Sequence, residues 1–285
     1  MGRRASVTGR RRRAGPVTVG ALALVGAVLV AGSAAGWFRP GAAVDGASGS
    51  DGSSAAPAAT PSEASTRDPI GGADPVETAR TTEPREVPET RATGLADAVD
   101  ATWVAAVAAA TGIPERAVAS YAGAELRLRA ELPGCGVDWA TLAGIGWVES
   151  HHGEIDGRVL GADGRPVPEV IGIALDGTST ALIRDTDGGA LDGDATWDRA
   201  VGPMQFIPGT WELYAADGDG DGETDPHQLD DAVLAAARYL CAAGGDLTRG
   251  EGWIAAVAAY NDSDAYNARV AEATSSYRAT ASGIG

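Results

Sequence analysis

The sequence of 285 residues predicts a mainly α-helical domain over residues 95–285, with a small β-hairpin and loop insertion. After residue 95, apolar residues recur at helical spacing in several segments. Residues 154–198 are instead rich in Gly and Asp and contain two short extended stretches on either side of Gly164, which predicts a hairpin. Residues 37–94 have almost no large apolar residue after Phe38 and are predicted to form a disordered linker.

The helix boundaries are predicted from local signals. The first helix is expected over residues 95–110. Pro114, with an acid after it, begins a second helix that runs to about residue 132. Asp138 is predicted to cap a third helix that ends at Glu149. Four further helices are expected at residues 208–214, 230–242, 251–260 and 264–277.

The N-terminal region has the pattern of an export signal. Residues 1–16 are basic and are predicted to be cytoplasmic. Residues 17–36 contain an uncharged apolar run and are predicted to be either a transmembrane anchor or a signal segment cleaved after Ser33-Ala-Ala35. We favour the anchor because the apolar run is long, and either alternative places the rest of the chain outside the cytoplasm.

Charge limits the choice of partners. The net charge is −17, and residues 14–285 carry 16 Arg against 39 acidic residues. Such a surface repels nucleic acid, which is therefore excluded as a partner. Cys135 and Cys241 are the only cysteines, and in an exported protein such a pair predicts a disulfide, two buried thiols being the alternative.

Glu149 is the first candidate for chemistry. If residues 138–149 are helical, Glu149 shares a face with Leu142, Ile145 and Gly146. A carboxyl group on an apolar face tends to keep its proton, and a glycosidase needs such a group to protonate a leaving oxygen. The alternative is a Glu at the helix end that faces water or forms a salt bridge.

Three segments in order carry a resemblance to a known family: Glu149-Ser-His-His-Gly153, Ala200-Val-Gly-Pro-Met-Gln-Phe-Ile-Pro-Gly-Thr-Trp211 and Ala258-Ala-Tyr-Asn261. They resemble lytic murein transglycosylases of the lysozyme-like superfamily, most of all the membrane-bound lytic transglycosylase B type. The resemblance implies a lysozyme-like catalytic domain that cleaves the MurNAc-β-1,4-GlcNAc bond of peptidoglycan and leaves 1,6-anhydroMurNAc ends. It implies no cofactor for catalysis.

The resemblance also implies roles for individual residues. Glu149 would act first as acid and then as base. Tyr260 and Asn261 would hold the acid and the substrate's acetamido group. The other residues expected to contact substrate are Thr196, Met204, Gln205 and Tyr266.

An acidic loop predicts a structural calcium site. Residues 217–225 place oxygen-bearing side chains and glycines as an EF-hand loop does, but Gln228 stands where that loop needs a bidentate Glu. The resembling family closes a longer loop with a carboxylate three positions later. The expected ligands are therefore Asp217, Asp219, Asp221, Glu223 and Asp231, and the alternative is a solvated Asp-Gly turn.

Two other functions remain open from the sequence. A muramidase would hydrolyse the glycan with Glu149 and a second carboxylate such as Glu154, Asp156 or Asp198. A catalytically silent wall-binding module would keep the fold alone. A second acidic run, residues 185–194, is expected to be a solvated loop, and the three histidines are expected at the surface or at the rim of the site.

Overall fold

The computed structural model describes residues 93–284. The predicted basic N-terminus, the anchor or signal segment at residues 17–36 and nearly all of the linker lie outside the described residues. Within them, no helix is both long and apolar enough to cross a membrane. The helices are η1 (Ala96–Ala98), α1 (Ala101–Thr111), α2 (Glu115–Glu131), α3 (Trp139–Ser150), η2 (Ile155–Gly157), α4 (Pro208–Tyr214), α5 (Leu229–Gly244), α6 (Gly250–Tyr260) and α7 (Asp264–Ala281).

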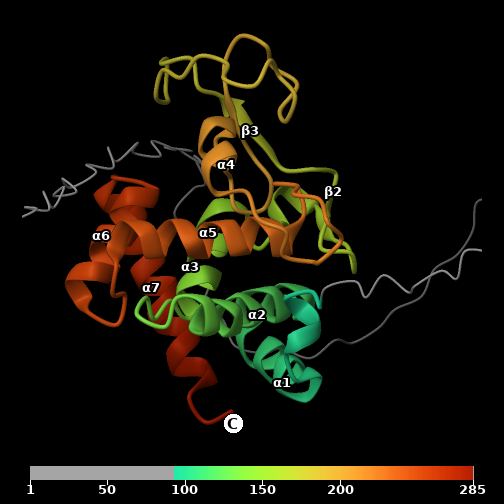
Figure 1. Cartoon of the computed structure of the whole chain (residues 1–285), viewed down its shortest axis with the longest axis vertical. Coiled ribbons are helices and arrows are strands. Elements are labelled where there is room, and N and C mark those ends of the chain that lie inside the picture. Colours follow the sequence, from blue (N-terminus) through green and yellow to red (C-terminus); the bar gives the residue numbers. More distant parts are fainter. Residues whose placement is uncertain (1–92, 285) are drawn as a thin grey trace, which may run out of the picture. The chain divides into compact units, whose positions relative to one another are not determined.

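The described domain is mainly α-helical and is built around α5 (Figure 1). Residues 229–237 of α5 are buried on every side, as expected for a helix in the centre of a domain. Helix α2 packs on α5, α1 packs on α2, and α6 covers the other end of α5. This arrangement confirms the mainly helical class and fits a lysozyme-like domain.

Two glycines let the neighbouring helices approach α3 closely. A Cβ atom on Gly144 would lie 2.4 Å from Thr274 Oγ1 of α7. A Cβ atom on Gly146 would lie 2.1 Å from the hydroxyl oxygen of Tyr121 of α2. Both distances are below van der Waals contact, so the small residues of α3 set its spacing from α2 and α7.

The strands form two small antiparallel sheets, the first of which is the predicted hairpin on either side of Gly164. Strand β1 (Val159–Leu160) pairs with β2 (Pro166–Val167), and β3 (Ile171–Ala174) pairs with β4 (Arg199–Val201). The extended stretch predicted after Gly164 includes β3, but the partner of β3 is β4, which follows the acidic run of residues 185–194. The segment between β3 and β4 extends away from the helices (Figure 1).

Most helix predictions are confirmed within a few residues. The exception is residues 95–110, where the chain breaks into η1 and α1 because Asp100 caps α1 and accepts a hydrogen bond from Trp103 N at 2.9 Å. Asp138 caps α3 as predicted and accepts from Thr141 N at 3.1 Å.

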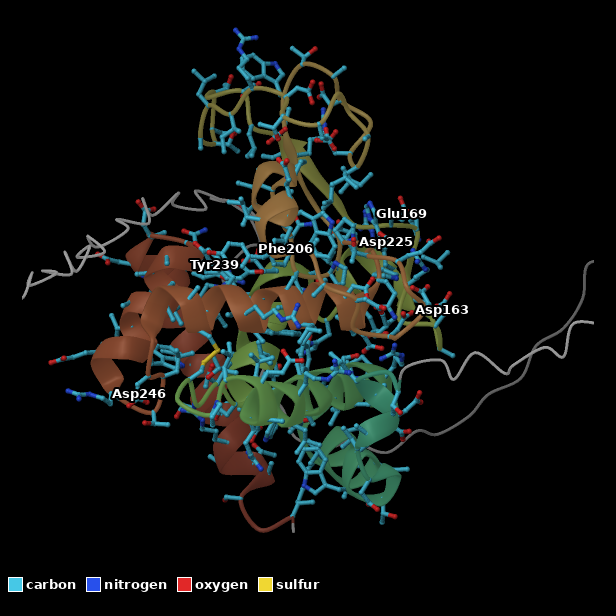
Figure 2. The ribbon with its side chains drawn as sticks, viewed as in Figure 1. Asp163, Glu169, Phe206, Asp225, Tyr239 and Asp246 are labelled. Atoms are coloured by element: carbon cyan, nitrogen blue, oxygen red, sulfur yellow. A yellow bond between two sulfur atoms is a disulfide. The ribbon has the colours of Figure 1, made fainter. Side chains whose placement is uncertain are left out.

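The predicted disulfide is present. Cys135 and Cys241 are bonded, and the bond joins the turn after α2 to α5, as the yellow bond in Figure 2 shows. Both residues are buried. The bridge closes a loop that contains α3, the strands and α4, and it therefore restricts the unfolded chain across the whole central region.

Candidate functional site

The candidate site begins at the last turn of α3. Glu149 is partly buried there, and the hydroxyl of Tyr266 donates to its Oε1 at 2.6 Å. Tyr266 lies in the first turn of α7, whose N-cap is Ser263, and is itself buried. The prediction that Glu149 lies on the buried, apolar side of the helix is confirmed, and no salt bridge holds it among the described residues.

Glu149 has the electrostatics of a carboxylic acid that keeps its proton. Burial raises its pKa from 4.5 to about 8, while the Tyr266 hydrogen bond and the positive charge of Arg269 oppose part of that shift. Arg269 is exposed and lies one helical turn after Tyr266 on α7. The spacing of Arg269 from Tyr266 is the one sequence signal for this residue, and it is visible only once Tyr266 is known to contact Glu149.

The turn from Gly202 to Gln205 is held next to Glu149 from two sides. Ser150, the residue after Glu149, donates its hydroxyl to Pro203 O at 2.6 Å. The hydroxyl of Tyr260, at the end of α6, donates to Met204 O at 2.7 Å. Ser150 belongs to the quoted Glu149–Gly153 segment, yet sequence alone gave it no role.

Gln205 adopts an unusual backbone conformation. Its φ is +49°, in the left-handed region that a non-glycine residue rarely occupies. Its side-chain amide donates to Gly202 O at 3.0 Å, and its Oε1 lies against the position that a Cβ on Gly172 would occupy. Such local strain is common at functional sites, and here it directs a buried amide toward β3.

The predicted aromatic and amide residues gather around the same turn. Met204, Tyr260, Asn261 and Tyr266 are all buried. The hydrogen bond to Glu149 comes from Tyr266, whereas the hydroxyl of Tyr260 binds the Met204 carbonyl. Negative charge on Glu149 nevertheless raises the pKa of Tyr260, after the larger effect of burial, so the two groups interact electrostatically.

Thr196 and the carboxylates considered for a hydrolase lie apart from this group. Thr196 is exposed in the loop before β4, and no hydrogen bond joins it to Glu149 in residues 93–284. Glu154 is exposed, and Asp156 pairs with Arg158 at 3.2 Å. Asp198 is buried and accepts hydrogen bonds from the backbone N–H and the hydroxyl of Thr186. No carboxylate contributes to the pKa shift of Glu149 within the described part of the chain.

The expectation of surface histidines is wrong for two of the three. His152 is 3 % exposed, and its ring nitrogens each lie 3.0 Å from a tyrosine hydroxyl, of Tyr121 and of Tyr277. His227 is also buried, with Nε2 at 3.1 Å from Leu191 O. His152 turns inward because it follows the end of α3 with a φ of +62°, a conformation that helical periodicity cannot describe.

The acidic loop brings some of the predicted calcium ligands together. Carboxylate oxygens of Asp217, Asp219 and Asp231 lie within 4.8 Å of one another, and Asp231 is buried. Asp221 and Glu223 are exposed, and their carboxylates do not join the group. Three clustered carboxylates, one of them buried, fit a hard divalent cation, and the calcium site stays a prediction.

The second acidic run is not a simple solvated loop. Asp185 Oδ1 accepts hydrogen bonds from the backbone of residues 187–189, and Asp192 accepts from Arg199 N at 2.6 Å. Asp192 and Asp198 are buried. These side chains supplement the isolated backbone bridges of the insertion, such as that between Arg184 and Trp197, and the sequence did not reveal this.

Comparison with known proteins finds a family similarity in the C-terminal part of the chain. Residues 180–284 match the family described as the Transglycosylase SLT domain. The match supports a peptidoglycan lytic transglycosylase of the lysozyme-like superfamily. It contains Gln205, Tyr260, Asn261 and Tyr266, whereas Glu149 lies before its first residue. Searches of curated proteins and of solved structures each found no match.

Proposed function

We propose that the protein is a peptidoglycan lytic transglycosylase that cleaves the MurNAc-β-1,4-GlcNAc bond and forms 1,6-anhydroMurNAc ends. The observation that carries this proposal is Glu149, a partly exposed carboxyl group whose pKa of about 8 keeps it protonated at neutral pH. A general acid works best when its pKa lies near the working pH. The finer resemblance, to the membrane-bound lytic transglycosylase B type, is part of this proposal.

In the first step Glu149 acts as the acid. Its proton passes to the glycosidic oxygen as the bond from that oxygen to C1 of MurNAc breaks, and GlcNAc leaves as an alcohol. Positive charge develops at C1, while Glu149 becomes a carboxylate. The hydroxyl of Tyr266, already 2.6 Å from Oε1, stabilises that new negative charge, and so does the nearby Arg269.

In the second step Glu149 acts as the base. It accepts the proton of the MurNAc 6-hydroxyl as O6 bonds to C1, which closes the 1,6-anhydro ring and restores the protonated acid. Because the nucleophile belongs to the substrate, this step has the advantage of an intramolecular reaction. The substrate's acetamido group stabilises C1, so one enzymic carboxyl group suffices. This agrees with the causes of the pKa shift of Glu149, which include no second carboxylate among residues 93–284.

The residues around the acid would position the sugar. We assign Asn261 to the acetamido group and Gln205 to substrate hydroxyls, because both amides are buried on segments next to the acid. Met204 would supply an apolar surface beneath the ring. Thr196 keeps its proposed contact with substrate only if the loop before β4 carries it toward the acid when glycan binds.

Mass spectrometry of digested peptidoglycan tests this function. Released muropeptides should lack a reducing end and should be one water lighter than the products of a muramidase. Glu149→Gln keeps the side-chain volume but removes the proton and should release no products, whereas Glu154→Gln, at an exposed position, should act like wild type. Reducing-end products would favour the muramidase, and glycan binding without release would favour the wall-binding module.

We further propose that calcium binds the acidic loop through Asp217, Asp219 and Asp231, whose carboxylates already lie together, and that Asp221 and Glu223 join them when the ion binds. The ion would supply charge neutralisation and would hold the loop in shape, with no part in the chemistry. The loop supports the start of the domain, because Leu95 N donates to Gly218 O at 2.8 Å. Calcium should therefore raise the melting temperature of wild type but not of Asp231→Asn, and a chelator should reverse the effect.

Residues 17–36 are proposed to anchor the enzyme to the cell membrane, with the catalytic domain on the outer side. The alternative is secretion after signal cleavage. Fractionation of cells that produce the full chain distinguishes the two, because an anchored protein stays with the membrane after a salt wash. A soluble product that begins after residue 35 would overturn the anchor.

A further inference from the structure

We infer that His152 is a positioning residue that ties α2 and α7 to the end of α3 and thereby holds Tyr266 on Glu149. Its Nδ1 lies 3.0 Å from the hydroxyl of Tyr121 on α2, and its Nε2 lies 3.0 Å from the hydroxyl of Tyr277 on α7. The imidazole thus joins two helices that do not otherwise share a polar contact at this point. The inference rests on the proposed function for its activity measurements.

Burial decides how the protons are arranged in this network. Tyr121 is fully buried, and its hydroxyl has no other hydrogen bond within residues 93–284, so its proton must go to Nδ1 of His152. His152 then carries its own proton on Nε2 and donates it to Tyr277, which is partly exposed and can pass its hydroxyl proton to water. Burial lowers the pKa of His152 to about 3, so the ring stays neutral and the direction of the network is fixed.

Helix α7 transmits this contact to the acid. Tyr266, Val270, Thr274 and Tyr277 follow one another at spacings of four, four and three residues and therefore share one face, which packs on α3. Tyr277 lies about 16 Å along the helix axis from Tyr266. A helix moves as a rigid unit over three turns. Fixing Tyr277 against the end of α3 therefore limits how far Tyr266 can slide or rotate.

Tyr266 has little tolerance for such movement. Its hydrogen bond to Glu149 is 2.6 Å long, and a shift of about 1 Å in a catalytic group can reduce a rate about 100-fold. The backbone adds a second constraint, because His152 N donates to Gly146 O at 2.9 Å while its φ is +62°. Side-chain and backbone bonds together hold a strained residue three positions after the acid.

The test compares variants that differ by a few atoms. His152→Phe keeps a ring but removes both nitrogens, and His152→Gln retains one donor and one acceptor. Tyr277→Phe removes a single oxygen at the far end of the network. The matched control is Tyr214→Phe on α4, a partly exposed tyrosine whose ring packs on Tyr239 away from Glu149.

We expect His152→Phe to lower kcat about tenfold while KM changes less than about twofold, because a positioning residue affects the reacting geometry more than substrate binding. Tyr277→Phe should lower kcat by a smaller factor. His152→Gln should recover most of the rate, and Tyr214→Phe should match wild type. In a Tyr266→Phe background, His152→Phe should cause little further loss. If instead the two losses multiply, or if folded His152→Phe turns over as wild type does, the inference fails.

A measurement without substrate separates this inference from the proposed function. The carboxyl carbon of Glu149 can be titrated by NMR in the free protein, where Tyr266 and Arg269 of α7 and Tyr260 of α6 are the groups that interact with it. Loss of the Tyr266 hydrogen bond should raise the pKa of Glu149, and both His152→Phe and Tyr277→Phe should move it the same way. An unchanged titration in folded Tyr277→Phe and His152→Phe overturns the inference. An active Glu149→Gln enzyme would instead overturn the proposed function and leave this titration valid.

Discussion

The two ends of α3 carry carboxyl groups with opposite properties. At the first end, Asp138 caps the helix and pairs with Arg278 of α7 at 2.6 Å. Although burial alone would raise the pKa of Asp138, hydrogen bonds from Arg278 and Thr141 bring it below its ordinary value. At the other end, Glu149 is bonded to the uncharged Tyr266 of the same α7, and burial raises its pKa to about 8.

The difference in pKa arises because burial dominates at Glu149, whereas hydrogen bonds and the charge of Arg278 outweigh burial at Asp138, and the position of each group on the helix acts in the same direction. Free backbone N–H groups at the start of a helix stabilise an anion, whereas the carbonyl groups at its end disfavour one. Helix α7 strengthens the first effect, because Arg278 bonds to Asp138, but it opposes part of the second, because Tyr266 donates to Glu149 and lowers its pKa. One pair of helices thus contains an ionised acid that stabilises the fold and a protonated acid suited to chemistry.

The largest expected effect is loss of activity at the second end. Glu149→Asp keeps a carboxyl group but withdraws it from Tyr266 by about the length of one C–C bond. Because that displacement exceeds about 1 Å, we expect kcat to fall at least about 100-fold with little change in thermal stability. Release of muropeptides per enzyme, measured alongside circular dichroism, checks this. A fall of less than threefold would mean that the carboxyl position does not control the reaction.

Stability as a function of pH should differ between the two ends. The pKa of Glu149 is raised from 4.5 in the unfolded chain to about 8 in the folded one, so its contribution to stability is complete below pH 4.5 and is lost as the pH rises through 8. Glu149→Gln cannot ionise and avoids this loss. The free energy of unfolding of Glu149→Gln, relative to that of wild type, should therefore increase by up to about 1.4 kcal/mol per pH unit between pH 4.5 and 8.

Denaturant titrations at pH 5, 7 and 9 measure that difference. Glu154→Gln serves as the control, because it removes an exposed carboxylate near the same helix end. Parallel pH curves for wild type and Glu149→Gln would show that Glu149 is not protonated in the folded protein. That result would remove the contrast between the two ends of α3.

A smaller effect is expected at the first end. Asp138→Ala removes the cap and the Arg278 pair, and should lower the free energy of unfolding by about 1–2 kcal/mol. Asp138→Asn keeps a capping oxygen and should lose less. Because the folded pKa of Asp138 is lowered, its contribution is present above pH 3.8 and is lost as the pH falls, so the difference from wild type should shrink in acid.

Activity provides the contrast for these Asp138 variants. A loss of about 1 kcal/mol leaves a domain of ordinary stability folded, so peptidoglycan cleavage at 25 °C should stay within about twofold of wild type. Cleavage that falls as far as in Glu149→Asp would mean that both ends of α3 serve the reaction. Stabilising the fold and supporting the reaction would then not be assigned to different ends of α3.

Local features of the fold were predictable from the sequence, and so was the apolar environment of Glu149, whose catalytic role stays a prediction. Asp138 as a cap, the break after α2 and the apolar face around Glu149 depend on neighbours within a few residues, which spacing reveals. The pairing of the two cysteines followed from their number. Such signals place an acid on a helix, but they do not say which groups from elsewhere contact it.

Contacts between distant segments were not predictable by the same reasoning. The Tyr266 hydrogen bond spans 117 residues and the His152–Tyr277 contact spans 125. Strand β3 pairs with β4 beyond the acidic run, where Asp185 accepts hydrogen bonds from the loop backbone and Asp192 accepts from Arg199 N of β4. These arrangements depend on how helices and loops pack, and no periodicity within one segment encodes that packing.

The smallest expected shift is that of the alkaline limb of activity when the Tyr266 hydroxyl is removed. Its hydrogen bond lowers the pKa of Glu149 relative to burial alone, so Tyr266→Phe should raise that pKa. Loss of the acid's proton limits kcat/KM at high pH, and the alkaline limb, expected near pH 8 in wild type, should therefore move to higher pH by less than about one unit. The maximum rate should fall at the same time, because the carboxylate formed in the first step loses its donor. A limb that moves to lower pH would mean that water replaces the hydroxyl, and that Tyr266 keeps Glu149 protonated by excluding solvent rather than by tuning its charge.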